Sequence, residues 1–260
     1  EMVLQAFGIA QHTFVTEDIA GRIAYEVMED AAKQNIKLFE VRFSPDWSFS
    51  KFNLNWDKAF ENMLKSKEKA EKEFDMAIGF ICISSRALGL ESCRKTFDWA
   101  INWKNEIQAI DLADGEAKFP ISDFRDPVIK AKTHGFKVTI HSGEDTPARY
   151  VADTINTVGA DRIGHGVHVI QDMSVINLVK NKGVTLELCP WSNYLTNSVS
   201  KIEEHPLKKL YDLGVKTTIN SDDPEILDTN MNNEIRIAVE ILGMNLADIN
   251  NCFKYAIEAS

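Results

Sequence analysis

The amino-acid sequence predicts an α/β fold, and more specifically a (β/α)8 barrel of the TIM type. Segments with the composition of β-strands alternate with helical segments along the chain. The predicted strands are apolar on both faces, which is typical of a parallel sheet covered by helices. Polar residues recur where these strands end, and barrel active sites are built on that face. A doubly wound open sheet is the alternative, but it would gather its site at one switch point.

The elements follow one another in a regular order. Residues 1–15 do not alternate convincingly, whereas Thr16 begins a helix in which Ile19, Ile23 and Val27 recur on one face. We predict seven strands, over residues 36–45, 74–84, 107–113, 137–141, 162–168, 184–188 and 215–220. After the helix that begins at Thr16, we predict helices over residues 56–72, 91–104, 126–133, 148–157, 173–181, 206–213 and 232–242, with a partial helix after Leu242.

The predicted strand number is one short of a closed barrel, which needs eight strands. No linker, repeat or low-complexity segment interrupts the chain, so we predict one catalytic domain over residues 1–260. We expect that this chain begins after the first strand of the barrel.

Composition excludes several classes of function. With 44% apolar and 26% charged residues, the chain can bury a large core. Its net charge of −10 argues against nucleic acid or an anionic membrane as a partner, because phosphate contacts need clustered Lys and Arg. The longest apolar runs have the length of strands, so we expect no membrane-spanning helix. The four cysteines lack Cys-x-x-Cys spacing and indicate reduced residues of a cytoplasmic protein.

The segment 137–145 (KVTIHSGED) is the centre of the predicted site. Its β-branched residues indicate a strand that runs directly into His141. His141 can offer a neutral nitrogen to a metal, and Glu144 can give or take a proton beside it. The small residues Ser142 and Gly143 would let a substrate approach the backbone closely.

Two other strand ends carry the same kind of residue. His165 lies in a Gly-His-Gly segment, and Asp222 and Asp223 form an acidic pair. Because successive strand ends surround one mouth in a barrel, these groups would converge with His141 and Glu144. Imidazole and carboxylate are suitable ligands for Zn²⁺, and a catalytic zinc lowers the pKa of its water. Each segment taken singly could be structural, since Asp-Pro favours turns and a glycine-flanked histidine suits a loop.

The remaining histidines and two arginines receive other interpretations. We expect His168 to lie beside the site and not to bind metal, and Trp191 to serve in packing. His12, His134 and His205 are interpreted as structural. Arg42 and Arg86 follow strands and could bind a substrate phosphate, or they could hold loop carboxylates.

These residues carry a resemblance to a known family. The motifs occur in the order HSGED (141–145), RIGHGVH (162–168), LELCPWSN (186–193) and NSDDPE (220–225), supported by EVRFSP (40–45), Ser85-Arg86 and DLADGE (111–116). Over nearly its whole length, the sequence resembles the adenosine deaminase family of the metal-dependent amidohydrolase barrels. The implied reaction is zinc-dependent hydrolytic deamination of adenosine to inosine and ammonia.

The resemblance also implies roles for individual residues. His141 and Asp222 would be zinc ligands, and His165 would orient the zinc water and act as a base. Glu144 would protonate N1 of the purine ring. Asp223 would accept a hydrogen bond from the N7 side of the ring, with a proton shared between them.

Two departures from the family pattern bear on this reading. Backbone amides near Asp114 and Gly115 would meet purine N3, although the glycine stands one place later than the family commonly has it. The family's first strand carries a His-x-His pair with two further zinc ligands, and no such pair occurs here. We therefore expect one zinc per chain, with those two ligands lying before residue 1.

Other functions compete with this one. Adenine or another 6-aminopurine is the closest alternative substrate. A two-metal hydrolase of the same superfamily would need a lysine at the end of the DLADGE strand, and none is present. A non-catalytic binding relic of the fold is favoured only by the absent His-x-His pair.

Overall fold

The structure, a computed structural model, describes residues 2–260 of the chain. Within those residues, seven parallel strands lie side by side in sequence order. The strands are Leu38–Phe43 (β1), Ala77–Ser85 (β2), Ile107–Ala113 (β3), Lys137–Ser142 (β4), Arg162–His165 (β5), Thr185–Leu188 (β6) and Thr217–Ile219 (β7). Each overlaps a predicted strand, so the sequence prediction of seven parallel strands is confirmed.

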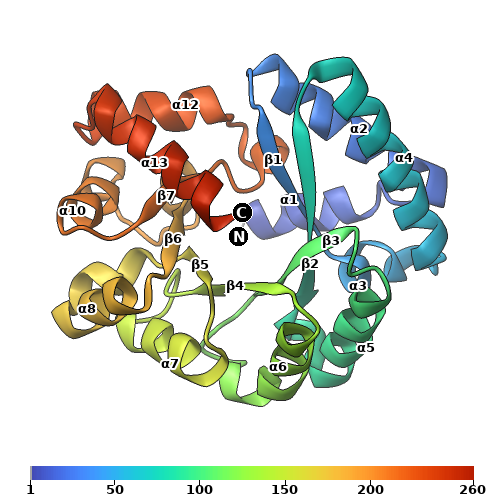
Figure 1. The fold of residues 1–260 in the computed structure, drawn as a ribbon, viewed down its shortest axis with the longest axis horizontal. Helices are drawn as coiled ribbons and strands as arrows, with labels where there is room; N and C mark the ends of the chain where they lie inside the picture. The colour runs from blue at the N-terminus through green and yellow to red at the C-terminus, as the bar shows by residue number, and fades with distance from the viewer. Residues whose placement is uncertain (1) are drawn as a thin grey trace.

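The sheet curls into an incomplete barrel surrounded by helices, while helix α1 (Met2–Gln11) crosses the centre of the view (Figure 1). Arg162 of β5 lies 2.5 Å from Glu40 of β1, and Arg42 of β1 pairs with Glu187 of β6. These contacts join strands that are far apart in the strand order, which is possible only if the sheet closes around a common interior. Within residues 2–260, β7 and β1 are not paired. The predicted α/β barrel is therefore confirmed, with seven strands.

Helices surround the sheet and fill the connections between strands. The α-helices before β4 are Met2–Gln11 (α1), Glu17–Lys33 (α2), Pro45–Ser48 (α3), Trp56–Phe74 (α4), Gly89–Asn102 (α5) and Arg125–Thr133 (α6). Those after β4 are Ala148–Val158 (α7), Met173–Lys182 (α8), Pro190–Leu195 (α9), Leu207–Asp212 (α10), Pro224–Leu227 (α11), Met231–Arg236 (α12) and Leu246–Ala259 (α13). Short 3-10 turns lie at Ser50–Phe52, Arg86–Leu88, Ile121–Phe124, Val167–Gln171 and Ile202–Glu204, and a π-helical turn lies at Ile237–Ile241.

Local signals explain where helices begin and end. The Thr16 side chain accepts a hydrogen bond from the amide of Ile19 and starts α2 where the sequence predicted. Helix α4 extends to Phe74, and Asp75 caps it with a φ of 49°. Strand β2 therefore begins at Ala77, three residues after the predicted start at residue 74. We expected only a partial helix after Leu242. That was wrong, because Asn245 and Asp248 form a capping box that begins the 14-residue helix α13.

The interior of the barrel is charged, contrary to the expectation of strands that are apolar on both faces. Arg42 lies 3.1 Å from Asp111 Oδ2, and the hydroxyl of Thr139 donates to Glu187 at 2.8 Å. Arg162 Nη1 also lies 3.2 Å from Glu187 Oε1. Buried charges are tolerated when they are paired with opposite charges in this way. The paired charges belong to different strands, so the sequence of any one strand does not indicate the pairing.

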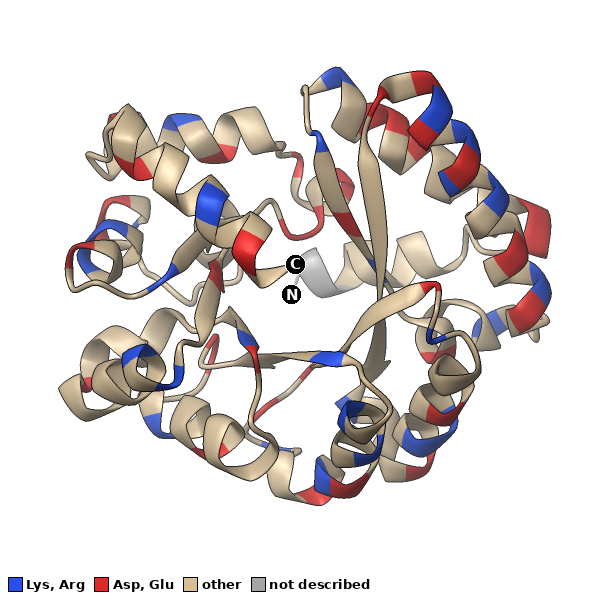
Figure 2. Cartoon of the chain, viewed as in Figure 1, with Lys and Arg blue, Asp and Glu red and all other residues tan. Residues whose placement is uncertain are grey.

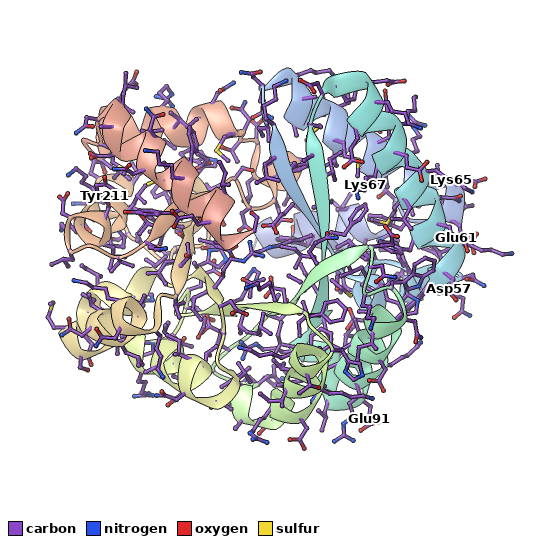
Figure 3. The ribbon with its side chains drawn as sticks, viewed as in Figure 1. Asp57, Glu61, Lys65, Lys67, Glu91 and Tyr211 are labelled. Atoms are coloured by element: carbon purple, nitrogen blue, oxygen red, sulfur yellow. The ribbon has the colours of Figure 1, made fainter. Side chains whose placement is uncertain are left out.

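The outer surface carries charges of both signs. Figure 2 shows acidic and basic residues interspersed along α4. Asp57, Glu61 and Lys65, labelled in Figure 3, follow one another four residues apart on its exposed face. Among residues 2–260, none of the helices combines the length and the apolar character that crossing a bilayer requires.

Candidate active site

The carboxyl ends of the strands bring four predicted residues together: His141, Glu144, His165 and Asp222. We call this group the polar mouth. His165 Nε2 lies 3.4 Å from Glu144 Oε2 and 4.0 Å from Asp222 Oδ2. The rings of His141 and His165 lie edge to face, with their centroids 5.0 Å apart and an interplanar angle of 67°. Residues from β4, β5 and the end of β7 thus form one constellation, as the barrel prediction implied.

His141 is held by a buried carboxylate. Its Nδ1 atom lies 3.0 Å from Asp111 Oδ2, and Asp111 is fully buried between His141 and Arg42. Burial opposes the protonation of His141, but the negative charge of Asp111 outweighs it and raises the pKa of His141 to about 9. A carboxylate on one ring nitrogen leaves the other nitrogen available to a metal and orients the ring.

The loop that follows His141 is shaped by Glu116. The carboxylate of Glu116 accepts hydrogen bonds from the amide of Gly143 at 2.6 Å, the amide of Glu144 at 3.0 Å and the hydroxyl of Thr146 at 2.5 Å. Gly143 has a φ of 71°, which favours glycine, and a Cβ there would lie 2.6 Å from Val151 Cγ2. Together these contacts set the direction in which Glu144 leaves the backbone.

His165 is almost completely buried, and its other nitrogen contacts Asn193. The two atoms, Asn193 Nδ2 and His165 Nδ1, are 3.0 Å apart. His165 has a φ of 63° and Asp222 a φ of 59°, a region that non-glycine residues rarely adopt. Such conformations cluster at functional sites because surrounding contacts hold them there.

The two residues of the acidic pair, Asp222 and Asp223, differ in protonation. Asp222 Oδ2 accepts a hydrogen bond from the hydroxyl of Ser192 at 2.7 Å. Desolvation opposes ionisation of Asp222, but His165 and His141 outweigh it, so its pKa is lowered. Desolvation and the charge of Asp222 raise the pKa of Asp223 to about 8. Near neutral pH, Asp222 is thus ionised and accepts hydrogen bonds, whereas Asp223 retains a proton.

Three groups of the polar mouth could hold a metal ion. His141, His165 and Asp222 each offer a ligand atom, and these atoms lie within 4.8 Å of one another. Two imidazoles and a carboxylate are a donor set that suits zinc. The residues described therefore fit the predicted metal.

Asp114 and Gly115 occupy a different position. Both are exposed after the end of β3, and Asp114 accepts a hydrogen bond from the hydroxyl of Ser85. Among the residues that the structure describes, neither Asp114 nor Gly115 forms a hydrogen bond or ion pair with His141, His165 or Asp222. Glu116, the next residue, makes the contacts to the His141 loop instead.

The two arginines considered for phosphate binding are engaged within the protein. Arg42 pairs with Asp111 and Glu187. Arg86 is buried and donates to the carbonyl oxygens of His141 at 2.7 Å and Phe119 at 2.9 Å. The sequence left open whether these arginines bind a substrate phosphate or hold groups of the protein. Their contacts favour the second role.

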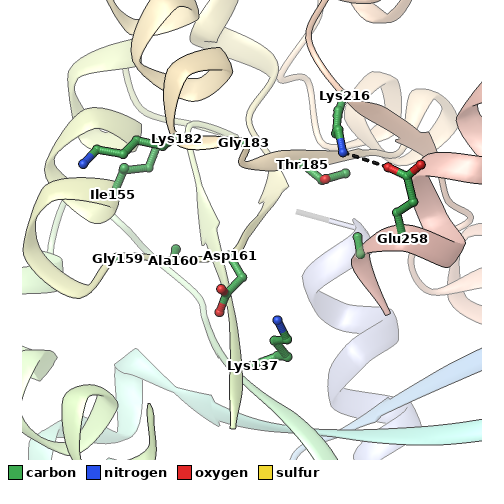
Figure 4. Close-up of a pocket in the computed structure, with 11 residues that line it drawn as sticks. Lys137, Ile155, Gly159, Ala160, Asp161, Lys182, Gly183, Thr185, Lys216 and Glu258 are labelled. Carbon is green, nitrogen blue, oxygen red and sulfur yellow. Dashed lines mark hydrogen bonds and ion pairs between the residues drawn. The ribbon is translucent and has the colours of Figure 1, made fainter. Parts of the chain in front are cut away.

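A separate cavity lies at the opposite end of the barrel. Its volume is about 280 Å³, and it is lined by residues at the amino ends of strands, including Lys137, Asp161 and Thr185 (Figure 4). Lys216 and Glu258 close one side with an ion pair of 2.7 Å. In barrels of this type, that face serves stability and not catalysis.

Several site residues were missed by sequence reasoning. Asp111 and Glu116 stood in a quoted motif without a role, Asn193 was named only in a motif, and His205 was interpreted as structural. In the structure, His205 Nε2 lies 3.1 Å from Asn193 Oδ1, so it belongs to the surroundings of His165. Asp111 and Glu116 could have been found as acidic residues at the end of an apolar strand. The contacts of Asn193 and His205 join segments that meet only in the folded chain, so no local pattern indicates them.

Comparisons with known proteins agree with the fold and identify a family. A family model described as adenosine deaminase matches residues 1–260. An adenosine deaminase of Clostridium perfringens is 34% identical over 240 residues, covering 92% of this chain and 72% of the relative.

Two solved structures share the fold. An adenine deaminase from Arthrobacter aurescens has a TM-score of 0.89 at 22% identity, covering 94% of this chain and 75% of that chain. An amidohydrolase from Burkholderia ambifaria with bound Zn has a TM-score of 0.89 at 23% identity, covering 95% and 69%.

Proposed function

This chain belongs to the adenosine deaminase family, and we propose that it deaminates adenosine to inosine and ammonia by zinc-dependent hydrolysis. The family match and relatives about a third identical over most of the chain make it an adenosine-deaminating enzyme. The observation that carries the mechanism is the convergence of His141, His165 and Asp222 within 4.8 Å, with Glu144 beside them.

The proposed cofactor is one zinc ion per chain, held by His141 and Asp222. When bound, zinc supplies Lewis-acid activation of water. A tight site needs more than two protein ligands. We propose that a His-x-His pair on an additional strand completes it, beside β1 where the described sheet lacks a partner. The zinc in the Burkholderia ambifaria structure supports this choice of metal.

The proposed roles of the protein residues follow from their chemistry. Glu144 protonates ring nitrogen N1, which makes C6 more electrophilic towards the attacking water. Of the two protons that the water releases, one leaves with the amino group as ammonia and the other restores Glu144. His165 orients the attacking water. Asp222 combines metal binding with orientation of that water, and Asp223 pairs with the N7 side of the ring. Backbone amides near Asp114 and Gly115 would meet N3.

The substrate is proposed to be a nucleoside. Adenine or another 6-aminopurine is the closest alternative, and the Arthrobacter aurescens structure is titled an adenine deaminase. A phosphorylated substrate would need a cation near its phosphate, and the contacts of Arg42 and Arg86 argue against either serving as one. A binding relic without catalysis is the remaining alternative. The ordered contacts of Glu144, His165 and Asp222 argue against it.

The compartment and partners are proposed from the residues. The four cysteines are free and buried, which supports a reducing compartment such as the cytoplasm. The net charge supports a small-molecule partner and neither nucleic acid nor membrane.

The test combines metal analysis with an activity assay. Zinc content and the loss of adenosine absorbance would be measured for residues 1–260 and for the same residues preceded by a strand carrying a His-x-His pair. Zinc and turnover in the extended chain alone would support the proposed ligands. Zinc and turnover in both would show that the metal site is complete without them. Neither in either form, with the fold intact, would contradict the deaminase proposal.

A further inference from the structure

The two histidines of the polar mouth are held differently through their Nδ1 atoms. A neutral imidazole carries one proton, so the partner of one ring nitrogen decides what the other nitrogen presents. Nδ1 of His141 faces the carboxylate of Asp111, whereas Nδ1 of His165 faces the side-chain amide of Asn193. These partners demand opposite proton positions.

The orientation of Asn193 is decided by a chain of hydrogen bonds that begins at a backbone group. The amide of Leu207 can only donate, and it lies 3.3 Å from His205 Nδ1. His205 must therefore accept at Nδ1, so its single proton is on Nε2, which lies 3.1 Å from Asn193 Oδ1. With its oxygen accepting from His205, Asn193 directs its amide nitrogen to His165 Nδ1 at 3.0 Å.

Burial supports this direction. Asn193 is fully buried, and His205 and His165 are each 3% exposed, so water cannot replace a missing partner. Burial lowers the pKa of His205 to about 3, which keeps that ring neutral around neutral pH. A rotated Asn193 amide would set its N–H groups against the N–H of His205 and leave buried donors unpaired.

We propose that the amide of Leu207, His205 and Asn193 form a tautomer lock, which holds neutral His165 with its proton on Nε2. His165 then faces the polar mouth as a hydrogen-bond donor. At His141, Asp111 accepts from Nδ1–H, so the proton that a metal must displace is the one on Nε2. Asn193 and His205 act through His165 and are positioning residues.

The lock assigns separate tasks to the groups of the polar mouth. Donor geometry at Nε2 suits a contact to Glu144, 3.4 Å away, or to a substrate or water oxygen. Neutral His165 has no lone pair there with which to take a proton from water. Under the proposed function, on which this consequence rests, the proton acceptor is a carboxylate of the mouth and not His165. The tautomer itself does not depend on the proposed function.

The direct test is the proton position in each histidine ring. The full chain, labelled with ¹⁵N-histidine, would be studied by long-range ¹H–¹⁵N NMR above pH 7, without metal and with zinc. His134 and His12 serve as internal references, because their Nδ1 atoms lie 2.8 and 2.6 Å from carbonyl oxygens, which can only accept. We expect His165 and His205 to carry the proton on Nε2. A proton on Nδ1 of His165, or zinc coordination at its Nε2, would overturn the proposal.

A nearly isosteric variant tests whether the lock causes the tautomer. In Asn193→Asp, both side-chain oxygens accept, so His165 should carry a proton on Nδ1. In the zinc-loaded extended chain, we expect kcat for adenosine to fall by about 100-fold, with a shifted pH profile. In His205→Gln, the new amide can accept from Leu207 and donate to Asn193, so His165 should keep its proton on Nε2.

The outcomes separate the lock from the proposed function. An Asn193→Asp spectrum with His165 still protonated only on Nε2 would overturn the lock. If that variant does not fold, the spectrum of the unmodified chain still decides the proton position. Nε2–H on His165 without adenosine turnover in the zinc-loaded extended chain would leave the lock standing and contradict the proposed function.

Discussion

The Oδ2 atom of Asp111 lies 3.0 Å from Nδ1 of His141, and the same oxygen lies 3.1 Å from Arg42. A strand-end histidine is thereby joined to the charged interior of the barrel. The ring of His141 is oriented by a carboxylate whose own position is held by a buried guanidinium.

Removing the charge of Asp111 should weaken metal binding. In Asp111→Asn, the ring of His141 loses its anionic partner, and the zinc dissociation constant should rise about 10- to 100-fold. Competition with a chromophoric chelator measures this. Asp30→Asn on the exposed face of α2 is the control for removing one carboxylate charge. Equal affinity in Asp111→Asn and the unmodified chain would contradict the positioning role.

Replacing Glu144 should remove the proton donor and leave the metal. Glu144→Gln keeps the size of the side chain. In the chain extended by the His-x-His strand, we expect kcat for adenosine to fall by about 10²- to 10⁴-fold with unchanged zinc content. Glu61→Gln on the outer face of α4 makes the same chemical change away from the mouth (Figure 3). A Glu144→Gln variant with near-normal kcat would exclude Glu144 as the acid.

The carboxylate of Glu116 should stabilise the loop after His141. Glu116→Gln loses a charged acceptor of three hydrogen bonds, so the free energy of unfolding should fall by about 1.5–3 kcal/mol. Hydrogen exchange at the amides of Gly143 and Glu144 should become faster. Glu61→Gln again serves as the control, and unchanged exchange at these two amides would show that Glu116 does not hold the loop.

Gly164 should be intolerant of a methyl group because of His141. A Cβ at Gly164 would lie 3.1 Å from His141 Nδ1, so Gly164→Ala should displace the ring from Asp111. We expect weaker zinc binding and lower kcat, measured alongside the melting temperature. Gly8→Ala is the matched control, since a Cβ there meets no atom within 4 Å. Wild-type zinc affinity in Gly164→Ala would mean that the ring of His141 accommodates the methyl group.

Stability should depend on His205 at acid pH. The pKa of His205 is lowered from 6.5 to about 3 in the folded chain, so between these values the unfolded chain binds more protons. The contribution of His205 to stability is thus present above pH 6.5 and is lost as the pH falls towards 3, by up to about 1.4 kcal/mol per pH unit. Denaturant unfolding of His205→Gln should lack this slope. Parallel pH curves for the two proteins would contradict the buried neutral state.

Some features of the site could be predicted from the sequence because their signals are local. A strand followed by His141, a helix begun by Thr16 and the acidic pair at Asp222 each occupy a few adjacent residues. Barrel geometry then places all strand ends around one mouth, so His141, Glu144, His165 and Asp222 could be expected to meet. The charged interior could not be predicted, because Arg42 has its partners on β3 and β6.

The sequence by itself determined which chemical groups stand at the ends of the strands, because strand periodicity and turn residues act over short distances. Only the tertiary structure decided which proton each of those groups carries. His165 contacts Asn193 across 28 residues of sequence, and His205 contacts Asn193 across 12. The direction of a buried hydrogen bond depends on every partner in its chain, and those partners come together only when the barrel folds.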